Sequence, residues 1–214
     1  MIGCEVLPSA IGIMTRTPTV IKVIYDSKAS TYGEITSLLL PEVKKVREKQ
    51  LYHDLSPKET HAAIKTHFDI VKEECGVLDS KEVEVEIRTS YCPTMTILDL
   101  PGTVSGSTDT AVDTKSSGIT GKYFRKKEEQ SIILCESSVG DTSGIGTAIK
   151  LVKKEQVSTR TVVVLTKIDK VSLVQAIVVI YLVPFSYRFC FLTIVDIHFS
   201  YYYYFASLFL DHGC

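Results

Sequence analysis

The chain has 214 residues, a formal net charge of −1 at pH 7 and 45% hydrophobic residues. This length is enough for one domain with a sizeable core, and the near-zero charge implies no bulk attraction to nucleic acid or acidic lipid. Six cysteines are scattered without a CxxC pair, which favours buried thiols in a reducing compartment over a disulfide framework. The first ten residues lack the basic start and long apolar run of a secretory signal.

The sequence LPSAIGIMTRTPTVIKV, residues 7–23, predicts a loop that leads into an apolar strand. Thr15 lies just before this strand, and Gly12 gives the approach flexibility. A threonine hydroxyl in such a loop can ligate Mg²⁺, and its main chain can hold an attacking water. On its own, the pattern is explained better by an ordinary loop threonine.

Residues 56–76 predict a helix with a clear beginning and end. Ser56 can cap it, Pro57 suits its first turn, and Glu59 completes a capping box. The apolar face is expected to carry Ile64, Phe68, Val71 and Cys75, and Gly76 can end the helix. His61 and His67 lie among Lys and Glu residues of this helix, and the histidines of the chain show no metal spacing.

Four further segments predict strands of a layered α/β fold. Residues 81–91, KEVEVEIRTSY, alternate charged and apolar side chains as a half-exposed strand does. The β-branched runs at residues 95–100, 131–138 and 161–169 fit buried strands of a mostly parallel sheet. A weaker helix, with Asp141 or Thr142 as its cap and Ile145, Ile149 and Val152 on one side, is expected over residues 141–156.

Two of these strands end in residues that suit a nucleotide site. Asp99 and Gly102 form a DxxG motif, in which the carboxylate can lie near Mg²⁺ and the glycine amide near a terminal phosphate, or which can simply close a Pro-Gly turn. Thr166, Lys167 and Asp169 form a TKxD motif. Its carboxylate can accept two hydrogen bonds from guanine, or the motif can be a solvated turn.

Ligands of open α/β sheets bind outside the carboxyl ends of strands, where both motifs lie. We therefore expect the two motifs to converge at one edge of the sheet, with Thr15 nearby.

Taken together and in this order, GIMTRTP, TILDLPG and VVVLTKID resemble three of the four guanine-nucleotide motifs of the dynamin superfamily of large GTPases. The resemblance covers roughly residues 5–172. It implies an α/β fold of the P-loop GTPase type, a layered sheet with flanking helices, with a partial G domain over residues 1–172. It also implies GTP and Mg²⁺ as ligands, GTP hydrolysis linked to membrane remodelling, and self-association through the G domain. A cytoplasmic location, at most peripheral to a membrane, and no nucleic-acid partner are expected.

The resemblance also assigns roles to single residues. It implies that Asp99, Gly102, Thr166, Lys167 and Asp169 contact the nucleotide. Thr15 would act in catalysis, and Thr15 and Asp99 would hold Mg²⁺.

The sequence departs from the family at several points. It contains no GxxxxGK[ST] segment, which the resemblance places on a first strand just upstream of Met1. That strand is central in such a sheet, so its loss would leave two strands without a partner. Ser9-Ala10 stands where the family tends to have Arg-Gly, and Gly118 and Gly121 weaken the helix expected near residues 116–130. The later guanine loop, the stalk and any lipid-binding region are missing. The alternative is therefore an inactive G-domain remnant that at most binds partners.

Residues 173–214 differ from the rest of the chain by their many apolar and aromatic residues, including Tyr201 to Tyr204. Three interpretations remain open: a membrane segment, divergent core strands, or non-native translation of T-rich DNA. Arg188 and Pro184 make a spanning helix costly.

Overall fold

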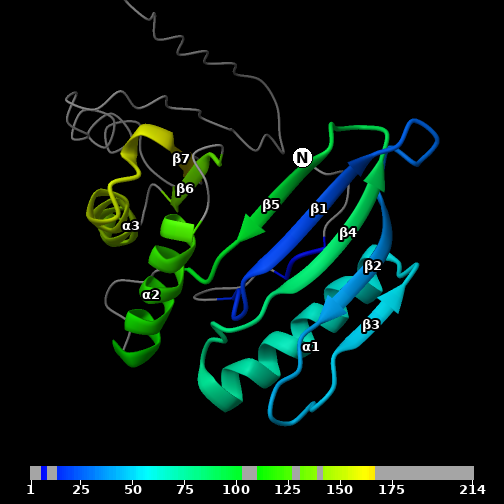
Figure 1. Cartoon of the computed structure of the whole chain (residues 1–214), viewed down its shortest axis with the longest axis horizontal. Coiled ribbons are helices and arrows are strands. Elements are labelled where there is room, and N and C mark those ends of the chain that lie inside the picture. Colours follow the sequence, from blue (N-terminus) through cyan, green and yellow to red (C-terminus); the bar gives the residue numbers. More distant parts are fainter. Residues whose placement is uncertain (1–5, 9–13, 103–109, 127–130, 139–141, 167–214) are drawn as a thin grey trace, which may run out of the picture.

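The computed structural model describes residues 6–8, 14–102, 110–126, 131–138 and 142–166. Strands and helices alternate along much of the chain, as expected for an α/β fold (Figure 1). The elements are β1 (Thr19–Tyr25), β2 (Glu34–Leu40), β3 (Gln50–His53), α1 (Pro57–Cys75), β4 (Val83–Thr89), β5 (Met95–Asp99), α2 (Thr110–Lys126), β6 (Ile133–Ser138), α3 (Thr142–Lys154) and β7 (Thr161–Thr166).

The described strands form a five-stranded sheet of order β3-β2-β4-β1-β5 and a two-stranded sheet of β6 and β7. β6 and β7 are parallel, as predicted. In the larger sheet, only the pair β1 and β4 is parallel. β5 runs antiparallel to β1, and β2 runs antiparallel to β3 and β4. The expectation of a mostly parallel sheet was therefore wrong for this part. The connection at residues 90–94 is too short for the crossover that a parallel strand requires.

The central strand β4 follows the predicted alternation. Val83, Val85 and Ile87 are fully buried, whereas Glu84 lies on the opposite face and forms a 2.6 Å ion pair with Lys22 of β1. One face of the larger sheet therefore carries the core, and the other carries charged side chains at its centre.

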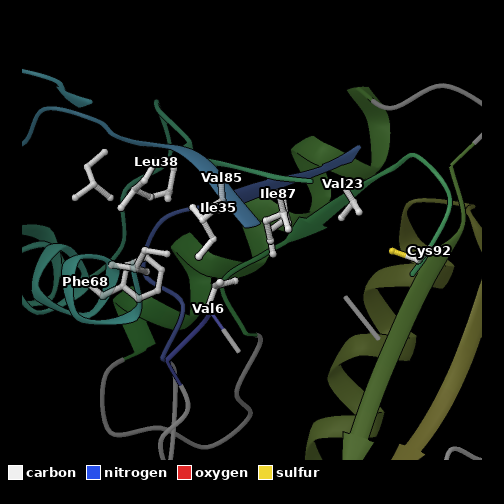
Figure 2. Close-up of a cluster of buried hydrophobic side chains, with 12 residues drawn as sticks. Val6, Val23, Ile35, Leu38, Phe68, Val85, Ile87 and Cys92 are labelled. Carbon is white, nitrogen blue, oxygen red and sulfur yellow. The ribbon is translucent and has the colours of Figure 1, made fainter. Parts of the chain in front are cut away.

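Helix α1 covers the apolar face of this sheet (Figure 1). Its N-terminus has the predicted capping box: the Glu59 N–H donates to Ser56 Oγ at 3.3 Å, and the Ser56 N–H donates to Glu59 Oε2 at 2.9 Å. Figure 2 shows Phe68 of α1 among the sheet residues, next to Ile35 of β2 and Val6. Ile64 and Val71 are buried as expected, and Gly76 ends the helix with a φ of +74°.

Helix α2 forms despite its two internal glycines. Ile119 and Tyr123 pack with Val77, and Leu98 and Leu100 at the end of β5 complete this cluster. The Tyr123 hydroxyl donates to Glu82 Oε1 at 2.6 Å, and burial together with that carboxylate raises the pKa of Tyr123. These contacts fix α2 beside the carboxyl end of β5.

The smaller sheet packs with α3, in which Leu151 and Val152 are buried. Ile132 and Leu134, expected in a buried strand, are 72% and 61% exposed. Both lie at or next to β6, which pairs only with β7 among the described strands. The interpretation of this run as a fully buried strand was therefore wrong.

Cys92 and Cys135 are buried thiols and Cys75 is half-buried; burial raises the pKa of Cys135. In the described part of the chain, none of the helices combines the length and the apolar character needed to cross a membrane. Residues 173–214 lie outside the described residues, and so does Asp141.

Candidate functional site

The loop before β1 meets the end of β5. The two strands are antiparallel, with Thr19 opposite Asp99, so the residues that precede β1 lie beside the carboxyl end of β5. Across this junction Thr15 Oγ1 donates a hydrogen bond to Asp99 Oδ2 at 2.6 Å. The sheet register thus brings together two side chains that are 84 positions apart in the sequence.

Thr15 and Asp99 offer a hydroxyl and a carboxylate oxygen from half-buried positions. Oxygen ligands of this kind suit Mg²⁺, which usually takes few protein ligands and completes its shell with water and phosphate oxygens. The described residues contain no group of three or more His, Cys, Asp or Glu side chains arranged to hold a metal ion. The pair therefore fits a shared magnesium site better than an all-protein metal centre.

Gly102 lies in the short segment after β5, which contacts α2. The Ser116 hydroxyl lies 3.0 Å from the carbonyl oxygen of Pro101 and 2.7 Å from that of Gly102. In a trans peptide the C=O and the next N–H point in opposite directions, so the Gly102 N–H points away from Ser116. Sequence reasoning missed Ser116, because no local pattern marks a helical serine that contacts the backbone of a distant segment.

The loop from Thr15 to Pro18 is attached to α1 and to the segment that follows it. Arg16 Nη1 donates to the carbonyl oxygen of Gly76 at 3.2 Å, which places a positive charge at the carboxyl end of α1. The Leu78 N–H donates to the carbonyl oxygen of Arg16 at 2.8 Å. Partial burial lowers the pKa of the Arg16 guanidinium.

His67 provides a further attachment that sequence reasoning missed. Its ring is only 5% exposed, and Nε2 lies 3.2 Å from Oγ1 of Thr17 in a buried hydrogen bond. Burial lowers the pKa of His67 from 6.5 to about 4. The spacing along the helix could have indicated that His67 is buried. It follows Ile64 by three residues and precedes Val71 by four, as a residue of the buried helix face does.

The predicted base-contacting motif is only partly within the described residues. Thr166 ends β7, but its side chain and the residues Lys167 and Asp169 lie outside the described part. β5 and β7 belong to separate sheets among the described strands. The convergence of Asp169 with Asp99 therefore stays a prediction.

Comparison with known proteins decides the family. The model of the family described as "Dynamin family" matches residues 1–168. The chain belongs to the dynamin family. The matched region is similar to its GTPase domain, and it includes Thr15, Asp99 and Gly102.

Three relatives of this family show how much of a longer protein the chain represents. The dynamin-like protein ARC5 of Arabidopsis thaliana is 29% identical over 102 residues, which are 46% of this chain and 13% of that protein. The interferon-induced GTP-binding protein Mx of Ctenopharyngodon idella is 24% identical over 77% of this chain and 26% of its own length. The mitochondrial dynamin-like GTPase msp1 of Schizosaccharomyces pombe is 24% identical over 85% of this chain and 19% of its own length. The chain spans about a quarter or less of these relatives.

Proposed function

We propose that this chain carries part of a guanine-nucleotide site in which Thr15 and Asp99 hold Mg²⁺ and Gly102 contacts the terminal phosphate. The observation that carries the proposal is the 2.6 Å hydrogen bond between Thr15 and Asp99, two motif residues from distant parts of a dynamin-family chain. In this proposal Thr166, Lys167 and Asp169 contact the base. When bound, Mg²⁺ would neutralise phosphate charge during phosphoryl transfer.

In this proposal, side chains of the protein position the ligands before phosphoryl transfer begins. Thr15 and Asp99 bring two oxygens to one point, and Ser116 holds the segment after β5 whose Gly102 amide would meet the phosphate. Phosphoryl transfer depends mainly on such positioning and on electrostatic stabilisation. The sequence supplies no GxxxxGK[ST] segment for the remaining phosphate contacts, so we expect GTP hydrolysis by this chain to be very slow or absent.

The division of the described strands into two separate sheets, each with its own edge strands, supports the proposal that this G domain is incomplete. β5 pairs only with β1, and β6 pairs only with β7, among the described strands. Ile132 and Leu134 next to that edge are largely exposed, although their composition suits a core. Exposed strand edges with apolar side chains are costly for a soluble protein, and a strand added here would cover them.

The family role in membrane remodelling and self-association through the G domain are part of this proposal for the longer protein. For the chain alone, the missing phosphate-binding segment favours a second candidate, a remnant without catalysis that at most binds partners. The two differ in a simple property: only the first binds guanine nucleotide.

Equilibrium binding of a fluorescent GTP analogue to the purified chain, with and without Mg²⁺, tests the proposal. We expect Mg²⁺-dependent binding that Asp99→Ala weakens, whereas the control Asp69→Ala, at an exposed position on α1, leaves it unchanged. No binding at millimolar nucleotide would favour the remnant. Hydrolysis at the rate of a family member that has the phosphate-binding segment would contradict the proposed impairment.

The base contact needs a separate test. In a chain extended with a GxxxxGK[ST] segment, Asp169→Asn should shift preference from GTP toward xanthosine triphosphate, because the required hydrogen-bond pattern is reversed. An unchanged preference for GTP would remove Asp169 from the base site.

A further inference from the structure

We propose that His67 is a positioning residue that holds the loop carrying Thr15, through its buried hydrogen bond to Thr17; its relevance to nucleotide chemistry rests on the proposed function. His67 belongs to α1 and contacts neither Asp99 nor Thr15 by any hydrogen bond in the described part of the structure. Its effect on the site would therefore be transmitted by the chain between Thr17 and Thr15.

Only a short piece of chain separates Thr17 from Thr15. Two residues of chain span at most about 7 Å, so fixing Thr17 confines Thr15 to a small volume beside β5. β1 begins only at Thr19, which leaves Thr15 and Thr17 outside the strand ladder. At residues 15–17 the loop is therefore held by side-chain contacts and by the backbone hydrogen bond from the Leu78 N–H to the Arg16 carbonyl, in place of ladder hydrogen bonds.

The Thr17 hydroxyl is held inside the protein rather than at its surface. Thr17 is fully buried, and its Oγ1 lies 3.2 Å from His67 Nε2. The Thr17 carbonyl in turn accepts a hydrogen bond from Thr19 Oγ1 at 3.1 Å. A buried hydroxyl that loses its partner bears a desolvation cost, so a displacement of the loop that breaks this bond is disfavoured.

Arg16 attaches the same loop at a second point. Its side chain reaches the Gly76 carbonyl at the end of α1, and its own carbonyl accepts from the Leu78 N–H. His67 in α1 thus holds Thr17, and Gly76 at the end of the same helix holds its neighbour Arg16. Because α1 is fixed against the sheet by Ile64 and Phe68, the position of the loop follows the position of the helix.

The chemistry of the imidazole suits this role. Burial lowers the pKa of His67 to about 4, so at neutral pH the ring is uncharged and pairs with a hydroxyl without burying a charge. One ring nitrogen donates and the other accepts in this form, and the tautomer decides which part Nε2 plays. A glutamine amide also offers a donor and an acceptor and serves as the conservative replacement.

Amide exchange of the full chain, followed by NMR, tests the proposal. The Leu78 amide reports on the loop, because it donates to the Arg16 carbonyl, whereas Val85 in the centre of β4 reports on global unfolding. Thr17→Val and His67→Leu should accelerate exchange of Leu78 by roughly threefold to tenfold relative to Val85, as expected for one lost hydrogen bond. His67→Gln should restore the slow exchange. Thr60→Val is the matched control, since the buried hydroxyl of Thr60 in α1 bonds, within the described part of the chain, only to the Ser56 carbonyl at the start of its own helix.

Two outcomes would overturn the proposal. Leu78 exchange that does not change in Thr17→Val would show that the bond does not hold the loop. Equal acceleration of Leu78 and Val85, as the Thr60→Val control is expected to give, would show that it only adds global stability.

Nucleotide binding by the same variants separates this inference from the proposed function. If the wild-type chain binds GTP, Thr17→Val should raise the Mg²⁺ concentration needed for half-maximal binding severalfold and leave Mg²⁺-free binding unchanged. An equal loss with and without Mg²⁺ would contradict a positioning role for Thr15. If the wild-type chain binds no GTP, the proposed function fails, and the Leu78 exchange still decides whether His67 holds the loop.

Discussion

Acidification below about pH 6.5 should destabilise this protein through His67. Burial lowers the pKa of His67 from 6.5 to about 4, so the folded protein keeps the ring neutral while the unfolded chain protonates it near pH 6.5. Between these two values the unfolded state binds more protons than the folded state. The free energy of unfolding therefore falls as the pH falls through this window, and the stabilisation is fully present only above about pH 6.5.

The size of the effect follows from the difference between the two pKa values. At 1.36 kcal/mol for each pKa unit, the difference between 6.5 and about 4 corresponds to about 3 kcal/mol. By linkage, roughly 2 kcal/mol of this would already be lost at pH 5. This is a large fraction of the 5–15 kcal/mol that is typical of folded domains (about 10 kcal/mol at the middle of the range).

Urea unfolding of the wild type and of His67→Gln at pH 7, 6 and 5 measures the effect. The stability of the glutamine variant should change much less over this range, because its side chain does not titrate. Hydrogen bonds lower the pKa of three glutamates from 4.5, so their contribution is lost only below about pH 4.5; these are Glu42, Glu59 and Glu73. Parallel pH dependence of the two proteins between pH 7 and 5 would refute the reasoning.

Three glycine substitutions should give different results for reasons of local space, all measurable by urea denaturation. Gly76→Ala should cost roughly 2–4 kcal/mol, because φ is +74° and the new Cβ would lie 2.8 Å from Val112 Cγ2; a loss below about 0.5 kcal/mol would contradict this. Gly118→Ala, at an exposed position of α2 with no atom within 4 Å, should gain roughly 0.5–1 kcal/mol. Gly121→Ala should lose that gain, because its Cβ would lie 2.9 Å from Glu155 Oε1; equal stabilisation by both substitutions would show that Glu155 moves aside freely.

Elements with strong local signals could be predicted from the sequence. Helix α1 has its cap, its first-turn proline and its terminal glycine within one segment, and the alternation of β4 shows which face is buried. β2 and β3 were not predicted. β3 has only four residues, and β2 ends in consecutive leucines without strict alternation, so their pairing is a property of the sheet rather than of either segment.

Burial was harder to predict than strand formation. The β-branched runs of β5 and β6 correctly indicated strands, but none of the residues of β5 is fully buried and Leu134 of β6 is largely exposed. An apolar strand is buried only when its neighbours cover it, and the sequence of the strand does not say which neighbours are present. The same limit explains His67, whose helix face was readable but whose partner Thr17 lies 50 positions away.

The pairing of Thr15 with Asp99 depends on residues that belong to no motif. Asp99 lies beside the Thr15 loop because β5 pairs with β1 in one register, with Ile97 opposite Ile21 and Met95 opposite Val23. A slip of two residues would keep every side chain on its face but would move Asp99 by about 7 Å along the strand, beyond hydrogen-bond reach of Thr15. The motif residues supply the oxygens, whereas the apolar pairs of the ladder and the attachment of the loop to α1 decide whether those oxygens meet. For that reason, substitutions at Thr17 or His67 are expected to change the site without altering any residue that would touch the nucleotide.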